Sequence, residues 1–250
     1  MTGVRFSLVA ILGLMVALLT GSPVRAETPV FSEAQKTEIE KLVHDYLVKH
    51  PEVLVEAANA LHEQQDQAEA EDRRKALREN HAALFDDAET PVIGNPKGDV
   101  TVVEFFDYAC PYCKSVDGSL RALLKEDGNI RLVLKEFPVL GPGSVVASEA
   151  ALAARAQGKY EPFHDALLAT RGQLSEEVVL NVARSVGLDV DRLKADMAKP
   201  DITSILKAAH ELAESLAIRG TPAFVVGDEV YPGALDLPTL KRMVEQARKG

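Results

Sequence analysis

The 250-residue sequence predicts an α/β protein preceded by a helical N-terminal arm. Apolar, β-branched runs at 100–106 and 130–137 are typical of buried strands, and a helical pattern joins them, so they form a parallel βαβ unit. A long helical section punctuated by glycine and proline follows at about 143–217. A short hairpin and a final amphipathic helix complete the order βαβ, helical insert, ββα.

Residues 1–26 indicate a cleavable export signal. Arg5 supplies a short basic region, residues 6–19 form an uncharged apolar core, and residues 24–26 offer small side chains before a cleavage site near Glu27. The core is too short to span a membrane comfortably, although an uncleaved anchor is the alternative. Export to an oxidising compartment would allow a disulfide to persist.

The charge balance argues against a nucleic-acid partner. Loss of residues 1–26 would remove Arg5 and Arg25 and no acidic residue, so the net charge of −10 would become −12. No basic patch or cluster of lysines and arginines argues for such a partner either.

Residues 27–90 form the predicted helical arm. Ser32 and Gln35 have the spacing of a capping box, and Pro51 is expected to begin a second helix. Apolar residues recur every three or four positions on one helix face: Ile39, Leu42, Tyr46, Val53, Ala57 and Leu61. A helix with such a stripe needs a partner, so we expect self-association through residues 33–61 rather than packing on the following domain. Residues 62–78 are polar and suit a spacer.

The domain at 91–250 has its elements in a regular order. A short strand at 92–94 and a turn at 94–99 precede the first main strand, and the insert is divided at Gly158, Gly172, Gly187 and Pro200. A hairpin then turns at residues 227–228, and a last helix covers 237–248.

The only two cysteines, Cys110 and Cys113, lie where the first main strand passes into a helix. Unpaired N–H groups and the positive end of the helix dipole at that position favour a thiolate over a thiol. Pro111 fits an early helical position, and one helical turn brings Cys113 back beside Cys110.

Three other readings of the cysteine pair are weaker. A structural staple across four residues would remove only about 2 kcal/mol of chain entropy. A zinc site lacks further ligands, because His44, His50, His62 and His81 have no ligand spacing and suit the surface. Two unrelated thiols would not need this spacing. We therefore expect a redox-active Cys110–Cys113 disulfide, with no metal and no further cofactor.

The element order, with Cys110-Pro111-Tyr112-Cys113 after the first main strand and Thr221-Pro222 before the third, resembles the thioredoxin fold in its DsbA-like form with a helical insert. The arm and the following segment at 94–108 are similar to those of the ScsC-like (suppressor of copper sensitivity) periplasmic proteins. The resemblance implies a periplasmic thiol–disulfide oxidoreductase.

This resemblance assigns roles to particular residues. It implies that Cys110 is the exposed nucleophile, that Cys113 is the buried resolving cysteine, and that Thr221-Pro222 forms a cis-proline loop that binds substrate. Glu104, six residues before Cys110, matches a buried acid that relays protons, although an exposed edge-strand glutamate is the alternative. Phe163 and His164 match core positions of the insert.

Two departures from the DsbA oxidases favour isomerase or reductase activity. The dipeptide is Pro111-Tyr112, whose phenol is neutral where those oxidases have a histidine, and Thr221 precedes the proline as in periplasmic isomerases. The alternatives are a dithiol oxidase and a protein that holds Cu(I) on its two thiolates. The resemblance further implies misoxidised or unfolded secreted proteins as substrates, a membrane redox partner, and a trimer.

Overall fold

The computed structural model describes residues 31–249, so the expected export signal at 1–26 lies outside the described residues. The described residues divide into two compact units, 31–61 and 62–249. Each unit is considered by itself below.

In the first unit, α1 (Glu33–Lys49) precedes the beginning of α2 (Glu52–Glu79). Ser32 caps α1 as predicted: its Oγ accepts a hydrogen bond from the Gln35 N–H at 3.3 Å, and its own N–H donates to Gln35 Oε1 at 2.9 Å. Pro51 separates the two helices, because proline suits a helix start and not a helix interior. No residue of α1 is buried, and the large apolar side chains of this unit are exposed, among them Ile39, Leu42, Val43, Tyr46, Leu54 and Leu61.

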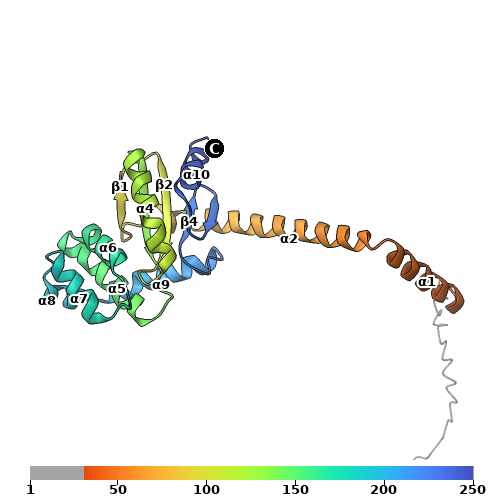
Figure 1. Ribbon diagram of the computed structural model, residues 1–250, viewed down its shortest axis with the longest axis horizontal. Helices are drawn as coiled ribbons and strands as arrows, with labels where there is room; N and C mark the ends of the chain where they lie inside the picture. The colour runs from red at the N-terminus through yellow and green to blue at the C-terminus, as the bar shows by residue number, and fades with distance from the viewer. Residues whose placement is uncertain (1–30, 250) are drawn as a thin grey trace, which may run out of the picture. The chain divides into compact units, whose positions relative to one another are not determined.

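The second unit is built on a five-stranded sheet with the order β1-β3-β2-β4-β5 (Figure 1). β2 and β3 are parallel and are joined by α4 (Pro111–Glu126), whereas the other pairs are antiparallel. β2 is the central strand, which explains its almost unbroken apolar run. The strands are β1 (Val92–Gly94), β2 (Val100–Phe106), β3 (Ile130–Glu136), β4 (Ala223–Val226) and β5 (Glu229–Pro232).

Alternate side chains of β2 face opposite sides of the sheet. Val102 and Phe106 belong to the core beneath α4 and α10 (Leu237–Ala247), whereas Val103 and Phe105 belong to the core on the other side. Figure 1 shows α4 crossing in front of the sheet. Glu104, between Val103 and Phe105, therefore lies on the α4 side.

The end of α2 and the short helix α3 (His81–Phe85) close the second face of the sheet. Leu77 and Leu84 are buried there in the same cluster as Val103 and Phe105. The compact unit begins at His62, whereas the residues at 86–91 predict a boundary near residue 90. Leu77 anchors the polar end of α2 to the sheet, and Leu84 anchors α3.

The helical insert lies between β3 and β4 and follows the predicted order. Small alanines of α5, including Ala147, Ala150 and Ala151, are fully buried and allow the surrounding helices to approach closely. None of the helices within residues 31–249 is long and apolar enough to cross a membrane. The insert comprises α5 (Pro142–Ala154), a 3-10 turn (Arg155–Gln157), α6 (Tyr160–Ala169), α7 (Glu176–Ser185), α8 (Val190–Met197) and α9 (Pro200–Ser215).

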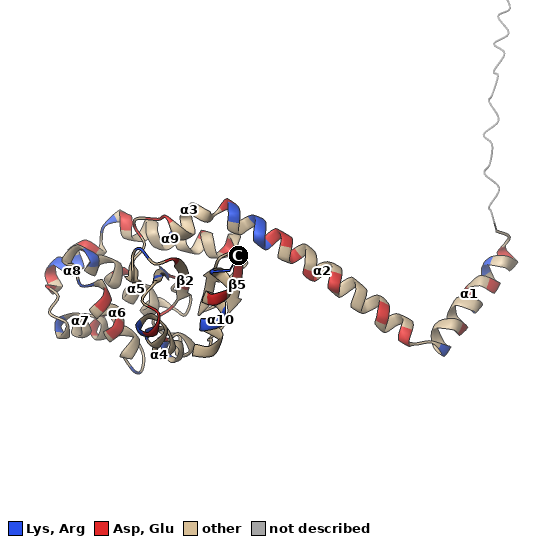
Figure 2. Cartoon of the chain, turned by 90° about the horizontal axis from the view of Figure 1, so that it is seen from above, with Lys and Arg blue, Asp and Glu red and all other residues tan. Residues whose placement is uncertain are grey.

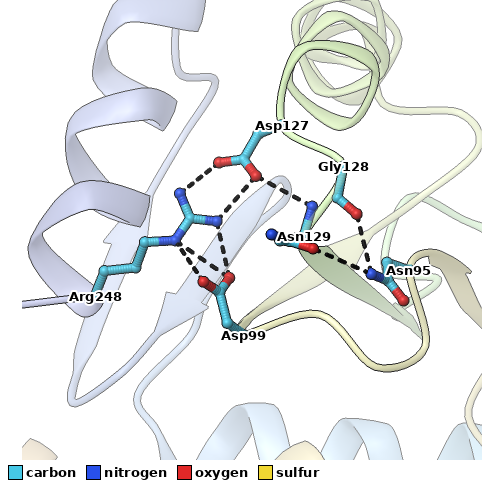
Figure 3. A network of polar contacts seen from close by, with 6 residues as sticks. All are labelled: Asn95, Asp99, Asp127, Gly128, Asn129 and Arg248. Atoms are coloured by element: carbon cyan, nitrogen blue, oxygen red, sulfur yellow. Dashed lines mark hydrogen bonds and ion pairs between the residues drawn. The ribbon is translucent and has the colours of Figure 1, made fainter.

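An arginine fastens the C-terminal helix to the start of the sheet (Figure 3). The Arg248 guanidinium donates to Asp99, which precedes β2, at 2.8–3.2 Å, and to Asp127, which precedes β3, at 2.6–2.9 Å. These hydrogen bonds lower the pKa of both carboxyl groups. Asn95 joins the same loops by donating to the Gly128 carbonyl at 3.0 Å.

Candidate active site

Cys110 is the N-cap residue of α4, and Pro111 occupies the first helical turn. The thiol of Cys110 donates a hydrogen bond to the carbonyl oxygen of Thr221 at 3.2 Å. The Thr221–Pro222 peptide bond is cis. The structure thus brings the loop before β4 against the beginning of α4, as the resemblance implied.

Cys113 lies in the first turn of α4 and is 1% exposed, and both cysteines are free thiols. Burial raises the pKa of the Cys113 thiol, and the neighbouring Glu104 and Cys110 act in the same direction. Pro111 and Tyr112, by contrast, are exposed. The motif therefore places its dipeptide in solvent and both thiols in the core. Cys110 is only 3% exposed, because the Thr221 carbonyl covers its sulfur, so the exposed nucleophile that the resemblance implied is not observed.

Glu104 is buried on the central strand, where it pairs with Leu134 of β3 and Phe224 of β4. The alternative of an exposed edge-strand glutamate is therefore wrong. Burial raises the pKa of Glu104 to about 8, and Asp117 and Cys110 add to this effect while Arg121 opposes it. A carboxyl group with such a pKa can exchange a proton with a neighbouring thiol near neutral pH.

A second buried carboxyl group, Glu136, was not predicted from the sequence. Its side chain accepts hydrogen bonds from the hydroxyl groups of Tyr108 at 3.0 Å, Tyr160 at 2.9 Å and Ser148 at 2.8 Å. Burial raises the pKa of Glu136 to about 8, although these three hydrogen bonds oppose the rise. The strand alternation could have revealed it, because Glu136 lies two positions beyond Leu134 and so shares the face of Glu104.

Asp107 is a further site residue that the sequence reasoning missed. Its fully buried carboxylate accepts hydrogen bonds from the N–H groups of Ala109 at 2.7 Å, Val139 at 2.8 Å and Leu140 at 2.9 Å. These bonds tie the loop after β3 to the segment that carries Cys110. The position of Asp107 between the end of a strand and the start of a helix could have indicated this role, because aspartate side chains at such positions often accept hydrogen bonds from nearby backbone N–H groups.

The predicted core role of Phe163 and His164 is confirmed, because both are buried. Burial lowers the pKa of His164 to about 3, and its Nδ1 lies 3.0 Å from the Tyr108 hydroxyl. His44, His50, His62 and His81 are exposed. Within residues 31–249, no group of three or more histidine, cysteine or acidic side chains could hold a metal ion.

Known proteins resemble both parts of this chain. The family profile described as DSBA-like thioredoxin domain matches residues 101–245, and the one described as copper resistance protein ScsC N-terminal domain matches residues 35–69. A thioredoxin-like oxidoreductase from Silicibacter pomeroyi is 49% identical, covers 68% of this chain and 99% of its own, and has a TM-score of 0.67. Proteus mirabilis ScsC in a transitional conformation is 32% identical, covers 88% of this chain and 99% of its own, and has a TM-score of 0.65. A periplasmic thioredoxin-like protein from Salmonella enterica serovar Typhimurium is 28% identical, with coverage of 68% and 96% and a TM-score of 0.61.

The first curated relatives are longer proteins. The Na(+)/H(+) antiporter NhaA 1 of Salinispora arenicola is 35% identical over 163 residues, which are 64% of this chain and 25% of the antiporter. The chain therefore spans about a quarter of the length of the curated relatives that it matches first. The match over residues 101–245 extends across more than half of the chain and includes both cysteines. The resemblance inferred from the sequence is confirmed: this chain belongs to the DsbA-like thioredoxin family of thiol–disulfide oxidoreductases.

Proposed function

We propose that this protein is a periplasmic disulfide isomerase or reductase that acts on protein disulfides through Cys110 and Cys113. The observation that carries the proposal is the placement of the Cys110 thiol at the start of α4, 3.2 Å from the Thr221 carbonyl oxygen, with the buried Cys113 in the first turn of the helix.

In the reaction, the Cys110 thiolate attacks one sulfur of a substrate disulfide, and the other substrate sulfur leaves as a thiolate that takes up a proton. Cys113 then transfers its proton to the Glu104 carboxylate, attacks the Cys110 sulfur and releases the second substrate thiol. The substrate gains two electrons, and Cys110 and Cys113 become a disulfide. In isomerisation, another substrate thiolate attacks the mixed disulfide in place of Cys113, so no net electron transfer occurs.

The motif supports isomerase or reductase activity over oxidase activity. Tyr112 is exposed and has a neutral phenol, so it offers no positive charge to stabilise the Cys110 thiolate. A less stabilised thiolate makes the disulfide less oxidising.

The arm supports assembly of several chains. Within residues 31–61, Ile39, Leu42, Tyr46 and Leu61 are each more than 40% exposed. Burying one such side chain is worth about 1.5–3 kcal/mol, so pairing of several arms is favourable. The match of residues 35–69 to the ScsC N-terminal domain supports the resemblance of the arm. The trimer that this resemblance implies would direct several Cys110 side chains at one misoxidised substrate.

A periplasmic location is supported by residues 1–26 and by the likeness to the periplasmic Salmonella protein. There the substrates would be exported proteins that are unfolded or that contain wrongly paired cysteines. A membrane protein would return Cys110 and Cys113 to the dithiol state.

The test combines sedimentation with reactivation of scrambled ribonuclease, using the mature chain, Leu42→Glu on the apolar stripe and Thr37→Glu as a control on the polar face of α1. The wild type and the Thr37 variant should sediment as trimers and reactivate ribonuclease. The Leu42 variant should sediment as a monomer, reduce a peptide disulfide at the normal rate and lose the isomerase activity. A monomeric wild type would refute the assembly, and failure of the wild type to exchange with any disulfide would refute the function.

A further inference from the structure

An apolar groove of about 370 Å³ lies beside the candidate active site, on the sheet face opposite α4. It begins at Thr221 and Pro222 and continues along the loop at 216–220, with Ala223, Val230 and Arg73 completing its wall. Pockets that bury ligands have volumes of about 300–1,000 Å³. Since Thr221 accepts the hydrogen bond from the Cys110 thiol, the groove is continuous with the site.

The floor of the groove is formed where α9 ends. Ile218 N–H donates to the Ala213 carbonyl at 2.8 Å and Ala217 N–H to the Glu214 carbonyl at 3.0 Å, which is the hydrogen-bond pattern of a Schellman motif. This tight turn buries Leu216 and Ile218 and leaves the next residue, Arg219, exposed at the rim.

Arg73 supplies the opposite rim from α2. It lies one helical turn before Leu77, which is buried against the same sheet face, and so shares the side of the helix that faces the unit. Figure 2 shows that basic residues gather at this end of α2.

The charged side chains that line the groove are all basic. Both arginines are exposed, no acidic residue lines the groove, and neither guanidinium forms an ion pair with any residue in the range 31–249. In a chain of net charge −10, two such arginines above an apolar floor form a site complementary to a carboxylate with apolar neighbours.

The groove adjoins the Thr221-Pro222 loop, to which the resemblance assigns substrate binding, so the substrate segment beside the reactive cysteine would lie along it. We propose that Arg73 and Arg219 on its rim select substrate segments that carry an aspartate or glutamate beside apolar residues. The proposal rests on the proposed function, because the substrate cysteine would be held at Cys110. It makes Arg73, from the end of the arm helix, a determinant of substrate choice.

The test measures binding and not chemistry. Two fluorescent peptides with serine in place of cysteine, one with glutamate and one with glutamine among apolar residues, are titrated with the intact protein by anisotropy. The glutamate peptide should bind about five- to tenfold more tightly, and Arg73→Gln and Arg219→Gln should each remove most of this preference. Arg74→Gln is the matched control, because Arg74 does not line the groove, and it should keep the preference.

Equal binding of the two peptides, or a preference that survives both substitutions, would overturn the proposal. If Arg73→Gln changed the sedimentation of the protein without changing peptide binding, a second copy of the chain would be the occupant and the proposal would also fall. Peptide binding with the predicted preference, in a protein that exchanges no disulfide, would retain the groove and refute the proposed function alone.

Discussion

The Cys110 thiol meets the carbonyl oxygen of Thr221 across 111 residues of sequence, at a distance of 3.2 Å. The sheet explains the contact. Phe105 near the end of β2 pairs with Ala223 at the start of antiparallel β4, so the segment leaving β2 and the segment entering β4 emerge side by side. The nucleophile and the loop opposite it are thus positioned by the central strand of the sheet and its antiparallel neighbour.

Alkylation should distinguish the two thiols. Cys110, at the helix start, should react with iodoacetamide faster than Cys113, because the raised pKa of Cys113 keeps its thiol protonated. Cys110→Ala should accordingly abolish exchange, and Cys113→Ala should accumulate mixed disulfides through Cys110. Mass spectrometry of trapped complexes measures both effects, and faster labelling of Cys113 would reverse the assigned roles.

Asp107→Asn should weaken both stability and activity. An amide group can accept at only one of the two oxygen positions that now bind Ala109, Val139 and Leu140, so at least one of these N–H groups loses its partner inside the site. The cost should be about 1–3 kcal/mol in urea denaturation, with a lower exchange rate because the Cys110 segment is no longer held. Asp191→Asn, in exposed α8, is the control and should change neither quantity.

Most of the fold could be predicted because its signals are local. The strands at 100–106 and 130–137, the turn at 227–228 and the capping box at Ser32 follow from side-chain period and backbone chemistry, and all are present. The cysteine spacing at a strand–helix junction likewise located the site.

What could not be predicted depends on contacts between distant segments. Leu77 and Leu84 look like isolated leucines in a polar stretch until the sheet supplies a surface for them. Glu136 appears as an ordinary charged strand residue until Tyr108, Ser148 and Tyr160 converge on it from other elements. Glu136 lies 12–28 residues away in sequence from the side chains that bind it. Local sequence patterns carry no information about contacts over such separations.

Ala217→Gly should stabilise the protein. Ala217 has φ of 55° at the end of α9, a left-handed conformation that costs a residue with a Cβ about 1 kcal/mol and suits glycine. Thermal or urea unfolding should show a gain of about 0.5–1 kcal/mol. Ala209→Gly, within the same helix, should instead destabilise the protein by about 1 kcal/mol or more. If both substitutions lowered the stability, the left-handed backbone conformation assigned to Ala217 would be contradicted.

Glu104→Gln should make the protein more stable, by an amount that depends on pH. Burial raises the pKa of Glu104 from 4.5 to about 8 in the folded state, so between these values the folded protein holds a proton that the unfolded chain has released. Wild-type stability must therefore fall as pH rises through this window, whereas glutamine cannot ionise and avoids the loss. The variant should match the wild type below pH 4.5 and exceed it by up to about 5 kcal/mol above pH 8.

Urea unfolding of the reduced proteins at several pH values between 4 and 9 measures this difference, with exposed Glu177→Gln as a control that should stay within about 0.5 kcal/mol throughout. The same Glu104 variant should release substrate more slowly, because Cys113 loses its proton acceptor, and mixed disulfides should accumulate despite the greater stability. A stability gap that is constant with pH would show that Glu104 ionises normally in the folded protein. In that case Glu104 could not hold the proton that Cys113 must give up near neutral pH.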